Sequence, residues 1–425
     1  MSVPCSTKVE ALMSKPKAKA ESLGPAFNRL WSASLASNLA DGLFKTSALL
    51  LAATLTKDPV VISILAAVVM LPWLLFAIPI GGIVDRIDRR LLLATANAVR
   101  FLMAAFLAVT VALDIVTIPI LYFVAFVIGA AEVLYDTTAQ SMIPQILKTK
   151  HLERGNARLE IGAVTVGEFV GTPLSGILFT AAIALPFVLG SAGILVAAVL
   201  VLMIPGNFKK AIATDENNVP TEPTKFWADI RFGIKYLYED KTLLKLVILT
   251  ASVGMFSAAT SSTVVLFLTE ELSVEPIWFG FVFIVPAVGA ILGSITAPKV
   301  STRFGRTTVM AYSMIAFCLA AVATGFSPNV LVFALVGLLM SITVTWWNVL
   351  LMSTYHQIIP NELFGRIHGT RRTLVWGLMP IGSLLGGFIA QFGLRMPYFI
   401  AGGVALLIAF VGFRFTVGLK RLIEA

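Results

Sequence analysis

Long apolar runs alternate with short polar segments along nearly the whole chain. A transmembrane helix needs about 20 consecutive apolar residues, and twelve runs are long enough. They form two sets of six, at 28–56, 59–83, 91–113, 117–146, 155–182 and 184–205, and then at 242–269, 276–299, 307–326, 328–358, 365–391 and 396–418. The pattern predicts an all-α polytopic membrane protein with twelve transmembrane helices in two six-helix halves.

Composition supports this class and excludes others. Hydrophobic residues make up 58% of the 425 residues and charged residues 13%, whereas soluble domains carry about 25% charged residues. A soluble enzyme is therefore excluded. An outer-membrane barrel is excluded too, because its strands would alternate polar and apolar residues over about ten positions.

The polar segments divide the chain into five predicted regions. These are a cytoplasmic tail at 1–26, a six-helix bundle at 27–206, a linker at 207–240, a second bundle at 241–421 and a short tail at 422–425. The linker ends in an amphipathic stretch, in which Phe226, Ile230, Ile234 and Leu237 recur at helical spacing. Such a helix lies in the membrane interface or packs under the bundle, and the sequence leaves both alternatives open.

The basic residues predict the orientation. If the N-terminus is inside, 28 of the 32 Lys and Arg residues fall in inner segments, and only Lys57 and Arg395 fall in outer loops. By the positive-inside rule, both termini face the cytoplasm of a bacterial inner membrane. The net charge of +9 therefore does not indicate nucleic-acid binding.

Cys5 lies in a polar tail and Cys318 in an apolar run, so we expect no disulfide between them. No cleavable signal precedes the first span, which we expect to be retained.

The two halves resemble repeats of each other. SMIPQIL at 141–147 corresponds to QIIPNEL at 357–363, and both close a fourth span. In the fifth span of each half, Gly171 and Gly176 match Gly382 and Gly387 in spacing. A duplicated six-helix unit around a polar linker is a transporter layout.

The loop between the second and third spans carries the sequence GGIVDRIDRR at 81–90. Its Gly81, Asp85, Arg86, Arg89 and Arg90 resemble the loop motif of the major facilitator superfamily, with Asp88 in place of a second glycine. The resemblance implies a gating latch, in which Gly81 lets helices approach closely and Asp85 pairs with arginines and a helix N-terminus. The alternative is a basic turn that only anchors topology.

A second motif lies in the fifth span. Gly167, Gly171, Pro173 and Gly176 resemble the antiporter motif of the same superfamily, which marks exporters. The glycines allow close helix packing, and Pro173 frees a backbone carbonyl and kinks the helix. Close packing alone is the alternative interpretation.

Ionisable residues inside the spans form a third set. A charge in the bilayer costs about 2.5–3.5 kcal/mol on insertion scales, so each needs a partner or water. The acids all lie in the first half, and the proton-coupling candidates are Asp41, Glu132, Asp136 and Glu168; Glu160 lies nearer the cytoplasm. Burial favours a neutral carboxyl group, so such a residue can load a proton near neutral pH. Glu168, inside the glycine motif, is the first candidate.

The alternative is that these acids form structural ion pairs, Asp41 with Lys45, and Glu132 or Asp136 with Arg100. The span-4 arginine found in many proton antiporters is absent from 125–129, which departs from the standard relay. An excess of acid would favour cationic or neutral amphipathic cargo.

Aromatic residues of the second half supply candidates for a substrate cavity. These are Phe256, Phe283, Trp346, Trp347 and Trp376. Aromatic and Met-rich surfaces adapt to varied apolar ligands. For any single member, packing is the competing interpretation.

No catalytic, metal or cofactor site is predicted. His151, His356 and His368 are isolated along the chain, and no P-loop is present, so ATP is not expected as an energy source. The resemblance to the major facilitator superfamily covers residues 27–421 and is nearest to its macrolide-efflux and enterobactin-exporter branch. It implies a monomeric, non-enzymatic exporter of small amphipathic molecules in the lipid bilayer, coupled to protons by alternating access. The alternative is export of a native metabolite such as a siderophore, or flipping of a lysolipid.

Overall fold

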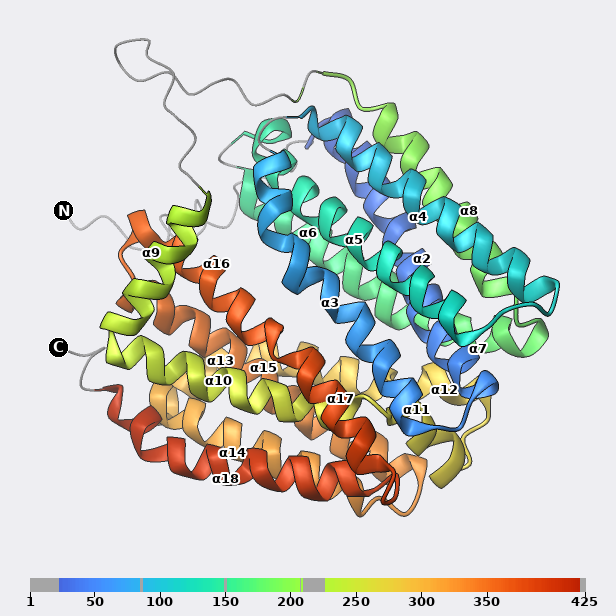
Figure 1. Ribbon diagram of the computed structural model, residues 1–425. Coiled ribbons are helices and arrows are strands. Elements are labelled where there is room, and N and C mark those ends of the chain that lie inside the picture. The colour runs from blue at the N-terminus through green and yellow to red at the C-terminus, as the bar shows by residue number, and fades with distance from the viewer. Residues whose placement is uncertain (1–22, 85–86, 149–150, 207, 209–225, 421–425) are drawn as a thin grey trace, which may run out of the picture.

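The computed structural model describes residues 23–84, 87–148, 151–206, 208 and 226–420, and these contain helices and no strand. The helices form two groups that lie side by side (Figure 1). The first group contains α2 (Pro25–Leu55), α3 (Pro59–Val84), α4 (Arg89–Ala112), α5 (Ile118–Ile146), α6 (Leu152–Ala163), η2 (Val164–Gly171), α7 (Thr172–Ala181) and α8 (Leu185–Leu202).

The second group follows the linker helix α9 (Phe226–Glu239). It contains α10 (Lys241–Ser261), α11 (Val264–Leu266), η3 (Phe267–Glu271), α12 (Pro276–Val282), α13 (Ile284–Phe304), α14 (Arg306–Gly325), α15 (Val330–Ile358), α16 (Asn361–Gly377), α17 (Met379–Ala390) and α18 (Met396–Gly418). The two groups are called the N half and the C half below.

Eleven stretches of helix among the described residues are long and apolar enough to cross a membrane. Helix α2 is not among them, because polar side chains such as Asp41 and Lys45 lower its hydropathy. It is nevertheless 31 residues long and packs along α8 and η2 inside the N half. We therefore count it as the first of the twelve predicted spans.

Local sequence explains where these helices begin. In a bilayer, backbone groups must bond within the segment, so helices are strongly favoured and their ends need caps. Proline stands in the first turn of α2, α5, α8, α12, α17 and α18, where its missing N–H costs nothing. At the starts of α4 and α10, Asp88 and Asp240 accept backbone N–H groups instead.

Several spans are interrupted where their sequences contain proline or glycine. In the fifth span, the π-helical turn η2 lies between α6 and α7 and ends at Gly171, two residues before Pro173. A proline cannot donate to the preceding turn, and a π-helical turn accommodates the lost bond. The irregularity that Pro173 predicts is thus present, in the form of a π-helical turn.

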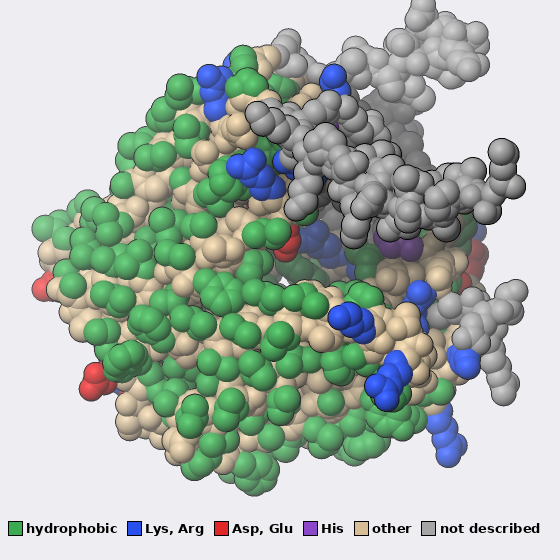
Figure 2. All heavy atoms as spheres, turned by 180° about the vertical axis from the view of Figure 1, so that it is seen from behind, with side chains coloured by type: hydrophobic (Ala, Val, Ile, Leu, Met, Phe, Trp, Pro, Cys, Tyr) green, Lys and Arg blue, Asp and Glu red, His purple; other side chains and the backbone are tan. Residues whose placement is uncertain are grey.

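The two halves contact each other mainly through two pairs of helices. Helix α3 packs on α17, and α7 packs on α12. Both contacts involve the same end of the bundle, where α3 and α12 begin at Pro59 and Pro276; this end is called the closed end. Figure 2 shows a hollow between the halves, bordered by acidic and basic side chains, and apolar side chains over most of the outer surface.

Helix α9 confirms the helical prediction for the end of the linker. It packs on α16 and α10, with Leu237 buried and Ile234 and Tyr238 exposed. Packing on the bundle, one of the two alternatives, is therefore observed. Residues 209–225 of the linker lie outside the described residues, as does Cys5, and Cys318 is a buried free thiol.

A candidate transport cavity and its charge cluster

Three adjacent cavities lie in and between the two halves. The middle cavity, of about 400 Å³, has walls from α2, α3 and α5 of the N half and from α10 and α17 of the C half. The N-half cavity, of about 380 Å³, shares Asp41, Lys45 and Glu132 with it. The C-half cavity, of about 640 Å³, shares Met70 and Met379 with it. These volumes are typical of small-molecule sites.

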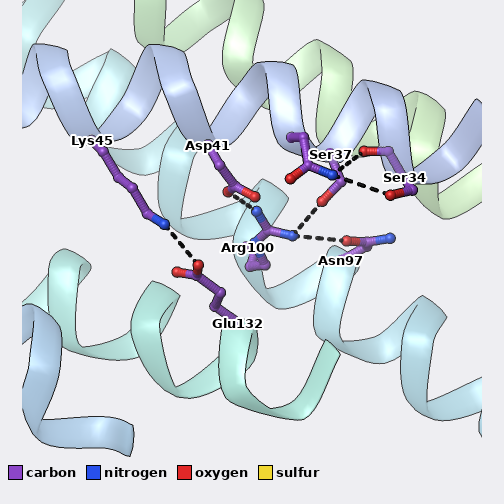
Figure 3. Close-up of polar contacts among 8 residues, drawn as sticks. Ser34, Ser37, Asp41, Lys45, Asn97, Arg100 and Glu132 are labelled. Carbon is purple, nitrogen blue, oxygen red and sulfur yellow. Dashed lines mark hydrogen bonds and ion pairs between the residues drawn. The ribbon is translucent and has the colours of Figure 1, made fainter. Parts of the chain in front are cut away.

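Arg100 of α4 is the centre of a charge cluster inside the N half (Figure 3). Its guanidinium is fully buried and pairs with Asp41 of α2. The same group donates to Ser37 Oγ at 2.7 Å and to Asn97 Oδ1 at 3.3 Å. An arginine has five donors in a planar fork, so it joins several acceptors at once. This network ties α4 to α2.

Lys45 forms the second ion pair of the cluster. Its Nζ lies 2.8 Å from Glu132 Oε1 of α5 (Figure 3). Lys45 lies one helical turn after Asp41 on α2, so both residues face the same neighbours. The structure thus exchanges the partners that sequence spacing suggested: Asp41 pairs with Arg100 rather than Lys45, and Glu132 pairs with Lys45 rather than Arg100.

Asp136 is the third carboxylate of this cluster. It lies one turn after Glu132 on α5 and lines the N-half cavity. No ion pair or hydrogen bond joins it to another described residue. The cluster therefore contains three carboxylates and two cations, and the charge of Arg372 on α16 also acts on Asp136. A carboxylate in this position needs water, a proton or a ligand cation.

Glu168, the first candidate from the sequence, is placed differently. It stands in η2 and lines the N-half cavity together with Asp136, but its side chain is exposed. Glu160 is exposed on α6 and lines none of the three cavities. The structure therefore brings Asp41, Glu132, Asp136 and Glu168 around one cavity and leaves Glu160 outside it.

The glycines of the fifth span make two kinds of contact. A Cβ atom on Gly171 would lie 3.0 Å from the Leu39 carbonyl of α2, inside the N half. A Cβ atom on Gly176 would lie 2.5 Å from the Pro276 carbonyl, across the boundary to the C half. Such distances leave no room for a side chain, so these glycines set how closely the helices approach.

The corresponding glycines of the C half repeat this arrangement. Gly382 packs against Met255 of α10 within its own half, whereas Gly387 packs against Ser63 and the Pro59 carbonyl of α3 in the N half. In each half, the first glycine of the pair, Gly171 or Gly382, packs against a helix of its own half. The second, Gly176 or Gly387, packs against the other half at the closed end.

An ion pair also crosses the closed end. Lys57, between α2 and α3, lies with its Nζ 2.5 Å from Glu270 Oε1 of η3. Both side chains are exposed, by 60% and 42%. This pair links the N half to the C half next to the two glycine contacts, and no pattern in the sequence predicted it.

The loop motif between α3 and α4 is only partly described. Asp85 and Arg86 lie outside the described residues, and Gly81 belongs to the last turn of α3. Arg89 donates to Ser141 Oγ at 2.9 Å and to the Phe208 carbonyl at 3.2 Å, and Arg90 donates to the Ile204 carbonyl at 3.1 Å. Both arginines therefore bind carbonyls that follow α8, where positive charge is favourable.

The predicted aromatic candidates are divided between cavity and packing. Trp347 and Trp376 line the C-half cavity, and Phe283 lines the N-half cavity. Trp346 instead donates its Nε1–H to Thr296 Oγ1 at 2.8 Å. Like Phe256, it packs against the apolar core of the C half. Two of the five candidates are thus packing residues in this conformation.

Sequence reasoning did not single out Arg371 and Arg372, which lie near the start of the predicted span 365–391 and entered the analysis only as inner basic residues. Both lie on α16 and line the C-half cavity. The Arg372 guanidinium carbon stands 4.9 Å from the ring centre of Trp73 and 4.6 Å from that of Trp376. Arg372 and Trp376 are four residues apart, which is the spacing of neighbours on one helix face. That spacing was the available signal.

Comparison with known proteins agrees with this architecture. Residues 22–421 match the transmembrane secretion effector family. The chain belongs to that family. Its members share the fold of the major facilitator superfamily, so the resemblance given by the loop and glycine motifs is confirmed at the level of the superfamily.

The chain also resembles a curated protein and several solved structures. The multidrug efflux pump Tap of Mycolicibacterium fortuitum is 23% identical over 363 residues, which cover 81% of this chain and 86% of that protein. A crystal structure of the nucleoside transporter NupG (D323A mutant) superposes with a TM-score of 0.77, at 12% identity, over 92% of this chain and 99% of the other.

A bacterial homologue of the iron transporter ferroportin, in an inward-facing state, gives a TM-score of 0.74. The two are 14% identical, and the match covers 93% of this chain and 100% of that one. At these identities the solved structures establish the fold alone. The chain is therefore a multi-pass membrane transporter, and no enzyme family is indicated.

Proposed function

We propose that this protein is a secondary active exporter of small amphipathic molecules, driven by proton influx through alternating access. The observation that carries the proposal is a set of adjacent cavities between two pseudo-symmetric halves, with apolar walls on one side and an acid-rich charge cluster on the other. Such a layout suits binding near the middle of the bilayer. The similarity to a multidrug efflux pump supports export.

We further propose the orientation and the organisation predicted from the sequence. Both termini face the cytoplasm of the inner membrane, the halves are the bundles at 27–206 and 241–421, and the working unit is a monomer. The closed end then faces outward, because its loops contain Lys57 and Arg395 and few other basic residues. On this orientation, the conformation described here is inward-facing.

In the proposed cycle, the closed end opens and the opposite end closes. The contacts of Gly176 and Gly387 across the halves, and the Lys57–Glu270 ion pair, are present in the inward-facing form and are lost in the outward-facing form. A proton or a substrate can drive this exchange only through different affinities for the two forms.

We assign the proton to the charge cluster, with Asp136 as the first candidate and Glu168 as the second. Asp136 belongs to the cluster and is its one carboxylate without an ion pair among the described residues. Asp41 and Glu132 are each held by a cation. Protonation of Asp136 would remove one of the three negative charges of the cluster and change the cost of closing the cavity around it.

The test is efflux of amphipathic fluorescent dyes, both cationic and anionic, from energised cells that express the protein. Cells without the protein are the control. We expect efflux of at least one dye above the control, and its collapse when a protonophore dissipates the proton gradient. Efflux that survives the protonophore while ATP is depleted would contradict proton coupling. Absence of efflux of every dye by well-expressed protein would contradict the broad amphipathic cargo.

A further inference from the structure

Two neighbouring tryptophans of α15 differ in what their indole N–H groups bind. Trp346 donates its Nε1–H to Thr296 Oγ1 of α13 at 2.8 Å. The indole N–H of Trp347 has no hydrogen bond to another described residue, although only 5% of this residue is exposed. A buried donor without an acceptor is unfavourable, so this difference between adjacent residues needs a physical reason.

The position of Trp347 supplies that reason, because its side chain lines the C-half cavity. Its Nε1 atom is not among the fully enclosed side-chain atoms that lack a partner, so the N–H group still reaches the space beside it. An indole N–H can only donate. Water can accept this hydrogen bond when no cargo is bound. A cargo molecule that displaces the water must bring an acceptor of its own, or the hydrogen bond is lost.

Two further donors line the same cavity. Asn348 follows Trp347 on α15, and Trp376 lies on α16. The side chains of both form no hydrogen bond with another described residue. Most of the other lining residues are apolar, including Met314, Phe317, Val344, Leu351, Met352 and Val375. A few donors on an otherwise apolar wall are typical of a site that orients a small molecule.

The charges around this cavity favour an uncharged cargo. Arg371 and Arg372 line it, and two positive charges make a bound cation unfavourable. Both arginines are already engaged within the protein. The charge of Arg372 interacts with that of Asp136 in the N half, and Arg371 has interactions of its own, including one with the Tyr355 ring. A bound anion is therefore not needed to balance them.

We propose that the Trp347 indole N–H determines which cargo the C-half cavity binds, and that this cargo is an uncharged apolar molecule with a hydrogen-bond acceptor, such as a ketone, ester or ether oxygen. The acceptor takes the Trp347 N–H, and the apolar body lies along the Met- and aromatic-rich wall. This rests on the proposed transport function and adds the chemical class of the substrate.

A buried donor discriminates between ligands more sharply than the apolar wall around it. Met and aromatic side chains adapt to molecules of varied shape, so such a wall selects weakly. A site built to donate a hydrogen bond rejects an analogue that lacks the acceptor, because the donor is then left dry and unpaired. Trp347 thus adds selectivity that the wall by itself does not have.

The first experiment measures probe binding to wild-type protein in amphipol by equilibrium dialysis, with amphipol alone as the background. Benzophenone has a carbonyl where diphenylmethane has a methylene group of similar size, and benzhydrylamine and diphenylacetate add a positive or a negative charge. One hydrogen bond predicts that benzophenone binds at least about fivefold more tightly than each of the other three. A smaller ratio to diphenylmethane, or a charged probe that binds as tightly as benzophenone, overturns the proposal.

The second experiment repeats the dialysis with Trp347→Phe, which keeps an aromatic ring but removes the N–H group. The ratio of benzophenone to diphenylmethane affinity should fall to about one, because only the carbonyl loses a partner. The matched control is Trp346→Phe, the same change at the adjacent position, where the N–H binds Thr296 instead of lining the cavity. This control should keep the wild-type ratio. An unchanged ratio in Trp347→Phe, or an equal fall in both variants, overturns the proposal.

A third measurement needs no variant, so it keeps the test decisive if Trp347→Phe unfolds. The carbonyl carbon NMR signal of isotopically labelled benzophenone should move downfield when wild-type protein binds it, relative to amphipol alone, because the oxygen accepts a hydrogen bond. A signal that stays in place overturns the proposal. The dye-efflux assay separates this inference from the proposed function. Protonophore-sensitive efflux without a preference for benzophenone refutes the subsite alone, and the preference without efflux refutes the export function alone.

Discussion

The two halves have similar helices but very different interiors. In the N half, α2, α4 and α5 place Asp41, Lys45, Arg100 and Glu132 in one network of ion pairs. In the C half, the corresponding interior is aromatic and Met-rich, and the guanidinium groups of its two cavity arginines stand over aromatic rings. The two interiors therefore differ in chemistry although the helices that surround them correspond.

The boundary between the halves, by contrast, is nearly symmetric. Gly176 and Gly387 occupy matching positions in the two repeats, and each packs against the first residue of a helix in the other half, Pro276 and Pro59. Gate geometry depends only on close backbone packing, which both repeats have kept. Interior chemistry depends on individual side chains, which have diverged.

The largest expected effect comes from removing the charge at the centre of the N-half network. Arg100→Met leaves the partly buried Asp41 without its cation and should destabilise the protein by about 3–5 kcal/mol. Loss of folded protein on size-exclusion chromatography after heating would measure this. The double variant Arg100→Met with Asp41→Leu should recover most of the loss, because an apolar pair can replace a buried ion pair. A stable single variant would contradict the structural role of the pair.

A second change tests which acid carries the proton. Asp136→Asn keeps the size of the side chain but cannot ionise, so we expect protonophore-sensitive efflux to fall at least tenfold while the folded protein stays equally abundant. Glu168→Gln is the matched variant on the other side of the same cavity, and it should have a smaller effect. If Glu168→Gln abolishes coupled efflux and Asp136→Asn does not, the proton site lies on η2, as the sequence first suggested.

A third change tests the symmetric gate. Gly176→Ala and Gly387→Ala each place a Cβ atom against the backbone or a side chain of the opposite half. Both should hinder closure of the outer end and slow efflux to a similar extent, by about tenfold if the added clash is about 1.4 kcal/mol. Gly403→Ala is the control, because a Cβ atom there meets nothing within 4 Å. Strongly unequal effects of the two gate variants would show that the repeats are not equivalent.

The smallest effect is expected at the ion pair across the closed end. Lys57 and Glu270 are both exposed, and such pairs contribute about 0.2–1 kcal/mol. Lys57→Gln should therefore shift the balance between inward- and outward-facing forms by about fivefold at most, and less at high salt. The rate at which a water-soluble thiol reagent labels a cysteine introduced into the middle cavity would report the shift. The charge exchange Lys57→Glu with Glu270→Lys should restore the original balance, and failure to restore it would rule out the pair as a latch.

The sequence by itself determined the class, the spans and the superfamily. Each span needs enough apolar residues to cross the hydrocarbon core and must form its backbone hydrogen bonds within its own helix. The sequence of each segment is therefore enough to predict that it spans the bilayer. The four acids around the N-half cavity were also identified, because an ionisable residue within an apolar run is conspicuous wherever it points. Phe256 and Trp346 were assigned to a cavity for their residue type, and type alone does not tell a cavity wall from a packed core.

Only the tertiary structure decided which groups meet. Spacing along α2 cannot tell whether Asp41 takes Lys45 or Arg100, because the choice depends on how α4 and α5 are rotated against α2. From the sequence, the arginines of α16 entered the analysis only as positive charge at the inner end of a span, whereas in the structure Trp73 from a distant helix packs against Arg372. Whether a segment spans the membrane depends on its own residues, but which side chains form ion pairs depends on how the helices cross.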